Sequence, residues 1–317
     1  MQRLTVHALL ACVLVGPLWT TARAQDPATA DVKVVLELSQ RFYYAGDPFP
    51  LRVSIGNDGA KKVANPIKTP FFKGFEVRAS DGEVIEPTGA PGVSEPSRPD
   101  KLAPGSFYGA IVDLTEIYPE LLEVGRYEVR WAANGVESEI IAVKMIPRYD
   151  PSKDYVARLS TSEGDIMIEL LEGSAPLAVK NFVDLAHADF YDNRSFNEIR
   201  SDAFIVGGGS AGYTYPAELS RLPVVAGTVL MKPMSPSPPA NGAEFIIALR
   251  PEPGWTGQFT VVGQVVEGLD VARKISQIPS TGRAGNPAFK PLEAVVIQDV
   301  AIMEKPDGER RPQVPAS

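Results

Sequence analysis

The chain has very few of the side chains that most often carry redox, metal or nucleophilic chemistry. Its 317 residues include one cysteine, Cys12, and two histidines, His7 and His187. A disulfide needs two cysteines, and a histidine-based metal site or catalytic triad needs more partners than the chain offers. Cys12 and His7 both lie in the N-terminal segment, so a mature chain that begins after Ala24 has no cysteine and keeps only His187. For that mature chain the composition excludes disulfides, thiol chemistry and metal sites built on Cys or His, and we expect no cofactor.

The chain also lacks an excess of basic residues. Asp and Glu number 39 against 31 Lys and Arg, which gives a net charge of −8. Because nucleic-acid-binding proteins show a basic excess or patch, no nucleic-acid partner is expected. The apolar content of 44% is typical of a globular protein, whereas 29 Pro and 27 Gly favour many short strands joined by turns. The length suggests two domains.

Residues 1–24 have the pattern of a secretory signal peptide. Arg3 supplies a positive start, Ala8 to Trp19 form an apolar stretch, and Ala22 to Ala24 form an A-x-A cleavage site. The apolar stretch is short for a bilayer span, and no later stretch approaches that length. We therefore expect an exported protein, periplasmic or extracellular, with no membrane-spanning segment. Lipoprotein processing at Cys12 is the alternative.

The pattern of residues 31–147 predicts an antiparallel β-sandwich. Residues 32–38 and 50–57 alternate apolar and polar side chains, as half-buried strands do. Further strands are expected over residues 75–78, 107–114, 125–131 and 138–146. About seven short strands in one domain suggest a sandwich. The pattern loosely resembles bacterial immunoglobulin-like (Ig-like) domains. The Pro-rich segment 87–104 is expected to be a loop, either a solvated connection or a binding loop.

The remaining elements are expected in residues 152–304. Residues 155–161 and 164–170 predict a hairpin, and a closing strand is expected over 292–303. Ser174 can cap a helix that begins near Pro176 and continues to about Ala188. A second amphipathic helix is expected over 268–278. The Pro-rich and charged residues 305–317 predict a disordered tail.

Three segments between residues 196 and 263 carry the most specific pattern. They read Phe-Asn-Glu-Ile-Arg and Phe-Ile-Val-Gly-Gly-Gly within 196–209, Gly-Ala-Glu-Phe-Ile-Ile at 242–247, and a Trp-to-Gly segment at 255–263. With the Gly-x-Ile-x-Ile-x-Leu strand at 164–170, they resemble the cyclophilin-type peptidyl-prolyl isomerases over about residues 154–304. The resemblance implies a closed eight-stranded antiparallel barrel with two helices. It also implies isomerase activity on X–Pro bonds, with proline-containing polypeptides as partners.

The resemblance implies an apolar groove that receives the proline ring. The side chains expected to bind substrate there are Phe204, Ile205, Ile246, Trp255 and Phe259. Barrels are also filled with such side chains, so a place in the core remains the alternative for three of them: Phe204, Ile246 and Phe259. Phe196 and Phe245 are expected in the core.

The polar part of the site departs from the family pattern. Glu198 stands where the family has its catalytic Arg, and Gly207 and Glu244 stand where it has Gln. An ionised carboxylate accepts hydrogen bonds but donates none. Arg200 lies two residues past Glu198, hence on the same strand face, and is the candidate catalytic donor. Glu244 is expected to contact the substrate as an acceptor.

These changes predict an isomerase with reduced activity. A non-catalytic module that binds peptides or acts like a chaperone is the first alternative. A structural or adhesion role led by the first domain is the second. Residues 207–212 also match G-x-G-x-x-G, but a dinucleotide site needs a helix opening at those glycines, and Pro216 argues against one.

Overall fold

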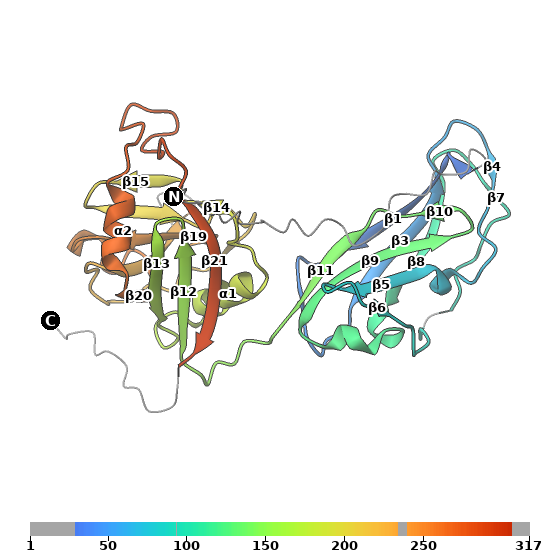
Figure 1. Ribbon diagram of the computed structural model, residues 1–317, viewed down its shortest axis with the longest axis horizontal. Helices are drawn as coiled ribbons and strands as arrows, with labels where there is room; N and C mark the ends of the chain where they lie inside the picture. Colours follow the sequence, from blue (N-terminus) through green and yellow to red (C-terminus); the bar gives the residue numbers. More distant parts are fainter. Residues whose placement is uncertain (1–28, 93, 234–239, 306–317) are drawn as a thin grey trace, which may run out of the picture. The chain divides into compact units, whose positions relative to one another are not determined.

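The computed structural model describes residues 29–92, 94–233 and 240–305 (Figure 1). The predicted signal peptide and residues 306–317 of the predicted tail lie outside the described residues. The chain forms two compact units, one up to Met145 and one from Ile146 onward. In the described ranges, no helix combines the length and apolar character that crossing a membrane requires.

In its described residues the first unit consists of short strands linked by turns and by short 3-10 helices. Its strands are β1 (Val32–Leu38), β2 (Tyr43–Tyr44), β3 (Pro50–Asn57), β4 (Val63–Ala64), β5 (Phe75–Ala79), β6 (Val84–Ile85), β7 (Lys101–Leu102), β8 (Phe107–Asp113), β9 (Gly125–Ala133), β10 (Val136–Glu137) and β11 (Ile141–Ile146). The 3-10 helices are Phe71–Gly74, Leu114–Glu116 and Pro119–Leu122. The last strand begins three residues later than its pattern predicted.

Two antiparallel sheets share the core of the first unit. One sheet has the order β1-β3-β8, and the other has the order β2-β11-β9-β5-β6, with β10 paired to β9. Alternate side chains of both sheets are buried in one apolar cluster that includes Val53, Val77 and Trp131. Two sheets packed on a common core are a sandwich, as the alternation predicted. The narrower resemblance to Ig-like domains stays a prediction.

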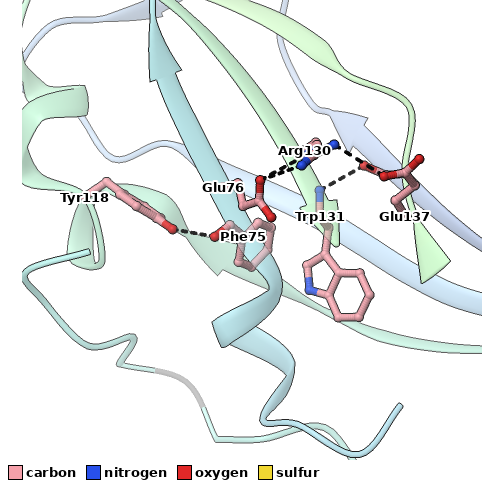
Figure 2. Close-up of polar contacts among 7 residues, drawn as sticks. Phe75, Glu76, Tyr118, Arg130, Trp131 and Glu137 are labelled. Carbon is pink, nitrogen blue, oxygen red and sulfur yellow. Dashed lines mark hydrogen bonds and ion pairs between the residues drawn. The ribbon is translucent and has the colours of Figure 1, made fainter. Parts of the chain in front are cut away.

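Polar side chains form hydrogen bonds and ion pairs within the sheet that contains β5 and β9, and between this sheet and a neighbouring turn (Figure 2). The buried Tyr118 hydroxyl donates to the carbonyl oxygen of Phe75 at 2.7 Å. On neighbouring strands, Arg130 forms ion pairs with Glu76 at 2.8 Å and with Glu137 at 3.3 Å. Strands β5, β9 and β10 thus have side-chain contacts in addition to their backbone ladder.

The predicted loop before β8 is held down by its side chains. Glu95 accepts a hydrogen bond from the Phe71 backbone N–H at 2.6 Å, and Arg98 donates to the Thr69 carbonyl at 3.1 Å. The segment includes the short strand β7, which pairs with β4. The connection is therefore anchored to the sandwich at several points.

In its described residues the second unit contains one large sheet, two α-helices and a short 3-10 helix. Its strands are β12 (Tyr155–Thr161), β13 (Gly164–Leu170), β14 (Arg194–Ser195), β15 (Glu198–Arg200), β16 (Phe204–Gly207), β17 (Thr214–Tyr215), β18 (Thr228–Pro233), β19 (Ala240–Ala248), β20 (Thr260–Glu267) and β21 (Val296–Glu304). The helices are α1 (Pro176–His187), α2 (Leu269–Ser276) and the 3-10 helix Pro253–Trp255. The predicted hairpin, both helices and the closing strand are all present.

The ten strands form a continuous antiparallel sheet. Its order is β14-β21-β12-β13-β20-β18-β19-β16-β15, with β17 paired to β19. The two ends of this path, β14 and β15, follow each other in the chain, separated by residues 196–197. Among the described residues no strand pair joins these ends, so the structure shows a mainly β unit with two helices and does not show the closed barrel that the resemblance implied.

The N-terminus of α1 departs from the prediction. Ala175 occupies the capping position and makes no side-chain bond, so Ser174 is not the cap. The carboxylate of Glu218 accepts hydrogen bonds from the backbone N–H groups of Leu177 and Ala178 at 3.0 and 2.8 Å. A carboxylate suits this place, because it satisfies free donors and complements the helix dipole.

Candidate active site

Four neighbouring strands bring apolar residues onto one face of the large sheet. The ladder pairs Val206 with Ile246, Ile246 with Leu230 and Leu230 with Val261. Directly paired residues project to the same side, so the four side chains form a row. They belong to a buried cluster, called here the Ile246 cluster: Val206, Val224, Leu230, Ile246, Ala248 and Val261.

Partly buried apolar side chains complete the Ile246 cluster at its accessible edge. They are Leu171, Phe204, Leu222, Trp255 and Phe259. The rings of Phe204 and Trp255 lie 5.4 Å apart, and those of Trp255 and Phe259 lie 5.1 Å apart. Four of the residues predicted to bind substrate, Phe204, Ile246, Trp255 and Phe259, are therefore assembled in one place.

Ile205 does not join them. It pairs with Ile199 on one side and Ile247 on the other, and all three are buried. Because side chains alternate along a strand, Ile205 points away from the face that carries Phe204 and Val206. With 0% of its surface exposed, it packs in the interior and is not available to a substrate.

The same alternation places the glycines that follow. A Cβ built on Gly207 would meet the rings of Phe196 and Phe245 at 3.1 to 3.2 Å, so this position faces the interior. Gly207 therefore does not lie on the cluster face beside Glu198, and the residue opposite Glu198 on that face is Val206. Gly208 has a positive φ of 95°, and a Cβ there would lie 2.4 Å from the Ala243 carbonyl oxygen. After Gly212 the chain continues into β17 and not into a helix, so the dinucleotide pattern lacks its structural context.

Charged side chains border the Ile246 cluster at β15. Glu198 stands opposite Val206, and Arg200 stands opposite Phe204. The Arg200 Nε donates to Glu198 Oε1 at 2.9 Å. The guanidinium carbon lies 5.1 Å from the ring centroid of Phe204 and 4.2 Å from that of Phe289. Arg200 is thus placed between two aromatic rings, at the border of the cluster and half exposed.

Glu244 belongs to the same charged border. Its Oε1 accepts a hydrogen bond from Asn197 Nδ2 at 2.5 Å. Lys232 Nζ lies 3.5 Å from Glu244 Oε1 and 3.9 Å from Glu198 Oε2. The lysine ammonium therefore connects the two carboxylates that stand where the family pattern has Arg and Gln.

Sequence reasoning missed Lys232 and Asn197. Lys232 lies two residues after Leu230, so the strand alternation from Leu230 could have placed it on the cluster face. Its contact with Glu198 depends on the strand order β18-β19-β16-β15, which the sequence does not display. In the described part of the chain, no group of three His, Cys, Asp or Glu side chains is arranged to hold a metal ion.

Comparison with known proteins identifies the second unit. Residues 156–302 match the family described as cyclophilin type peptidyl-prolyl cis-trans isomerase/CLD. The peptidyl-prolyl cis-trans isomerase-like 1 of Neurospora crassa is 31% identical over 153 residues, which cover 44% of this chain and 93% of the relative. Peptidyl-prolyl cis-trans isomerase B of Streptomyces anulatus is 30% identical over 170 residues, which cover 46% of this chain and 95% of the relative.

Two further comparisons cover unequal shares of the proteins. The peptidyl-prolyl cis-trans isomerase-like 2 of Gibberella zeae is 28% identical over 171 residues, and the chain spans only 29% of its length. A crystal structure of a cyclophilin type isomerase from Cryptosporidium parvum has 25% identity and a TM-score of 0.44, covering 48% of this chain and 99% of that one. On the family match and its relatives, the chain belongs to the cyclophilin-type peptidyl-prolyl cis-trans isomerases.

Proposed function

We propose that the second unit catalyses cis–trans isomerisation of X–Pro bonds in exported polypeptides. The observation that carries the proposal is the Ile246 cluster, which gathers Phe204, Trp255 and Phe259 at an accessible edge beside charged donors. Apolar and aromatic side chains can hold a proline ring and exclude water from it. The family to which the chain belongs supports this substrate class.

To catalyse this reaction, the protein needs an apolar surface that binds the proline ring and a hydrogen-bond donor near the prolyl nitrogen. Amide resonance sets a barrier of about 18–20 kcal/mol to rotation. The cis and trans forms of an X–Pro bond differ by only about 0.5–1 kcal/mol, so lowering the barrier is enough for catalysis. Twisting the amide localises the lone pair of the prolyl nitrogen, and a preorganised donor near that atom stabilises the twisted state.

Arg200 remains in this proposal as a catalytic donor. Its Nε is bonded to Glu198, while the rest of the guanidinium carries further N–H groups beside Phe204. A substrate held on the Phe204 ring would lie within reach of these donors. Because Glu198 engages part of the guanidinium, we propose that activity is lower than an unengaged arginine would give.

A second candidate function follows from the carboxylates. Glu198 and Glu244 are only 21% and 14% exposed and accept hydrogen bonds or ion pairs from their neighbours. A site bordered by acceptors can hold a peptide through its N–H groups without accelerating rotation. The second unit would then be a peptide-binding or chaperone-like module.

Export is part of the proposal and rests on residues 1–24. The charged start, apolar stretch and A-x-A site of this segment support removal after Ala24, with the mature protein in the periplasm or outside the cell. Mass spectrometry of the protein recovered from an expressing bacterium tests this. An N-terminus at Gln25 is expected, whereas a retained Met1 would contradict export by this route.

The function is tested by exchange NMR on a short peptide with one X–Pro bond, using the whole chain. Wild type should accelerate exchange, and Phe204→Ala should lose most of that acceleration. In Arg200→Ala the acceleration should be several times smaller than in wild type. Peptide line broadening without faster exchange in the wild type would favour the binding module. If the wild type caused neither line broadening nor faster exchange, both functions would be contradicted.

A further inference from the structure

Lys232 is the cation that lies between the two carboxylates of the site. Its ammonium is 3.5 Å from Glu244 Oε1 and 3.9 Å from Glu198 Oε2, and its side chain is 31% exposed. Lys232 follows Met231, which pairs with Phe245, so Lys232 and Glu244 are cross-strand neighbours on β18 and β19. Glu198 is on β15, three strands away from β18 in the sheet.

The distance between strands β18 and β15 indicates where the Lys232 ammonium lies. Neighbouring strands are about 4.8 Å apart, so three strand spacings separate β18 from β15. Lys232 and Glu198 come within 3.9 Å only because both side chains extend across the strands between them, β19 and β16. On the cluster face these two strands carry Ile246 and Val206, which pair directly. The ammonium therefore lies over the charged end of the Ile246 cluster.

The ammonium is held there without using up its donors. A lysine ammonium has three N–H donors. Its distances to the two carboxylates are both longer than the 2.7–3.2 Å typical of a full hydrogen bond. Asn197 already donates to the Glu244 oxygen nearest to Lys232, at 2.5 Å. The contacts therefore orient the ammonium by charge and leave donor capacity for a ligand.

We propose that Lys232 is a further catalytic residue, which donates a hydrogen bond to the prolyl nitrogen of the twisted X–Pro amide. The proposal rests on the isomerase function proposed above and names the group that supplies its main electrostatic stabilisation. Glu198 and Glu244 are then positioning residues that keep the ammonium over the cluster. No proton is transferred and no covalent bond forms, because the hydrogen bond strengthens as the lone pair localises and weakens as rotation ends.

Lys232 is better placed than Arg200 for this role. The Arg200 guanidinium stacks on Phe289 at 4.2 Å, and its side chain is 45% exposed. It borders the Phe204 end of the cluster, whereas Lys232 reaches over the paired residues Ile246 and Val206. The larger loss of rate is therefore expected from Lys232, and Arg200 contributes from the border.

The test compares three lysine variants of the whole chain by exchange NMR. Lys232→Met keeps the length and removes the charge, and its kcat/KM should fall about tenfold to a hundredfold. Lys232→Arg keeps a cation and should recover part of the rate. The matched control is Lys274→Met, which removes a lysine of the same unit paired with one carboxylate, Glu163, at 2.9 Å. Its rate should stay within about twofold of wild type.

Peptide binding and stability separate catalysis from folding. Line broadening should show that Lys232→Met binds the peptide within about threefold of wild type, since the proline ring still meets the Ile246 cluster. Urea unfolding should show a cooperative transition with the wild-type slope, so that Lys232→Met is folded under the conditions of the rate measurement. An active wild type with an equally active Lys232→Met overturns the role of Lys232 and leaves the isomerase function intact. A wild type that binds but does not accelerate overturns both.

Discussion

The two units contain the same acid–base–acid pattern with different consequences. In the first unit Arg130 lies between Glu76 and Glu137, at 2.8 and 3.3 Å (Figure 2). In the second unit Lys232 lies between Glu198 and Glu244, at 3.9 and 3.5 Å. Both groups sit on the face of an antiparallel sheet. The charge pattern alone therefore does not tell a structural group from a functional one.

The difference lies in how the cation meets its acids. Arg130 is paired directly across the ladder with Glu76, and its Nε and Nη2 both donate to Glu76 Oε2, at 3.0 and 2.8 Å. Two hydrogen bonds from neighbouring nitrogens to one carboxylate oxygen hold the guanidinium in a defined orientation. Lys232 makes longer contacts, one of which crosses two strands, and it borders an apolar cluster with an accessible edge. A well-satisfied cation stabilises a sheet, whereas an oriented and unsaturated one can serve a ligand.

The largest effect that separates the two groups is expected from Arg130→Met. The change leaves Glu76 and Glu137 without their shared cation, and it should lower the free energy of unfolding by about 2 kcal/mol. Urea unfolding followed by circular dichroism measures this, and the exchange rate of an X–Pro peptide should not change.

The matched control for Arg130 is Arg52→Met. Arg52 pairs with Glu37 at 3.6 Å, and both side chains are more than half exposed. An exposed pair contributes about 0–1 kcal/mol, so this variant should unfold close to wild type. Equal losses for Arg52→Met and Arg130→Met would show that the first unit's group is no more structural than a surface pair.

The next effect is expected from Glu198→Gln. The amide keeps the shape of the side chain and removes the charge that draws Lys232 over β16. The value of kcat/KM should fall about fivefold, with little change in stability. In Lys232→Met the same change should not lower the rate further, because the ammonium that Glu198 orients is already absent. A rate increase in Glu198→Gln would instead mean that releasing Arg200 outweighs the loss of the oriented Lys232 ammonium.

The apolar half of the site could be predicted because the resemblance to the cyclophilin-type isomerases is carried by short segments of the chain. The resemblance implied a groove formed by Phe204, Ile246, Trp255 and Phe259, among other residues, and the structure assembles these four in one cluster. Ile205 shows the limit of this reasoning. Its neighbour in the chain, Phe204, is on the cluster face, so strand alternation places Ile205 in the interior.

The polar half depends on contacts between distant parts of the chain. Glu198 and Lys232 are 34 residues apart and meet across three strand spacings, which requires knowledge of the strand order. The cap of α1 shows the same limit, because Ser174 has suitable chemistry but Glu218 supplies the bonds from outside the helix. Backbone elements could therefore be predicted from local pattern, whereas side-chain partners set by tertiary structure could not.

A smaller effect is the pH dependence of stability that Tyr118, close to Glu76, gives to the first unit. Burial, followed by the nearby charges of Glu76 and Glu86, raises the pKa of Tyr118 to about 12. The unfolded state then loses this proton near pH 10, while the folded state keeps it, so folding stability falls as pH rises from about 10 to about 12. Urea midpoints measured from pH 9 to pH 12 should show a shallower decline for Tyr118→Phe than for wild type.

Tyr118→Phe also has an effect at neutral pH that serves as an internal check. It removes the hydroxyl that donates to the Phe75 carbonyl, and the free energy of unfolding should fall by about 1 kcal/mol. Glu76→Gln should lower the pKa of Tyr118, because it removes one of the charges that raise it. Parallel pH profiles for wild type and Tyr118→Phe would show that other tyrosines govern the alkaline decline.

The smallest effect is expected from added salt. It tests whether Lys232 is oriented by the charges of its two acids, whereas Arg130 is held by short hydrogen bonds. Screening lengths fall from about 10 Å at 0.1 M to about 3 Å at 1 M ionic strength. The Lys232 contacts are long and partly exposed, so salt should weaken the orientation of the ammonium and lower kcat/KM by about twofold. Arg130 is held by short hydrogen bonds with defined geometry, so the part of the unfolding free energy lost in Arg130→Met should be nearly independent of salt. In Lys232→Met the salt dependence of the rate should disappear. If it persisted there, the salt effect would come from the peptide or another charge, and the ammonium would not be oriented by its two acids.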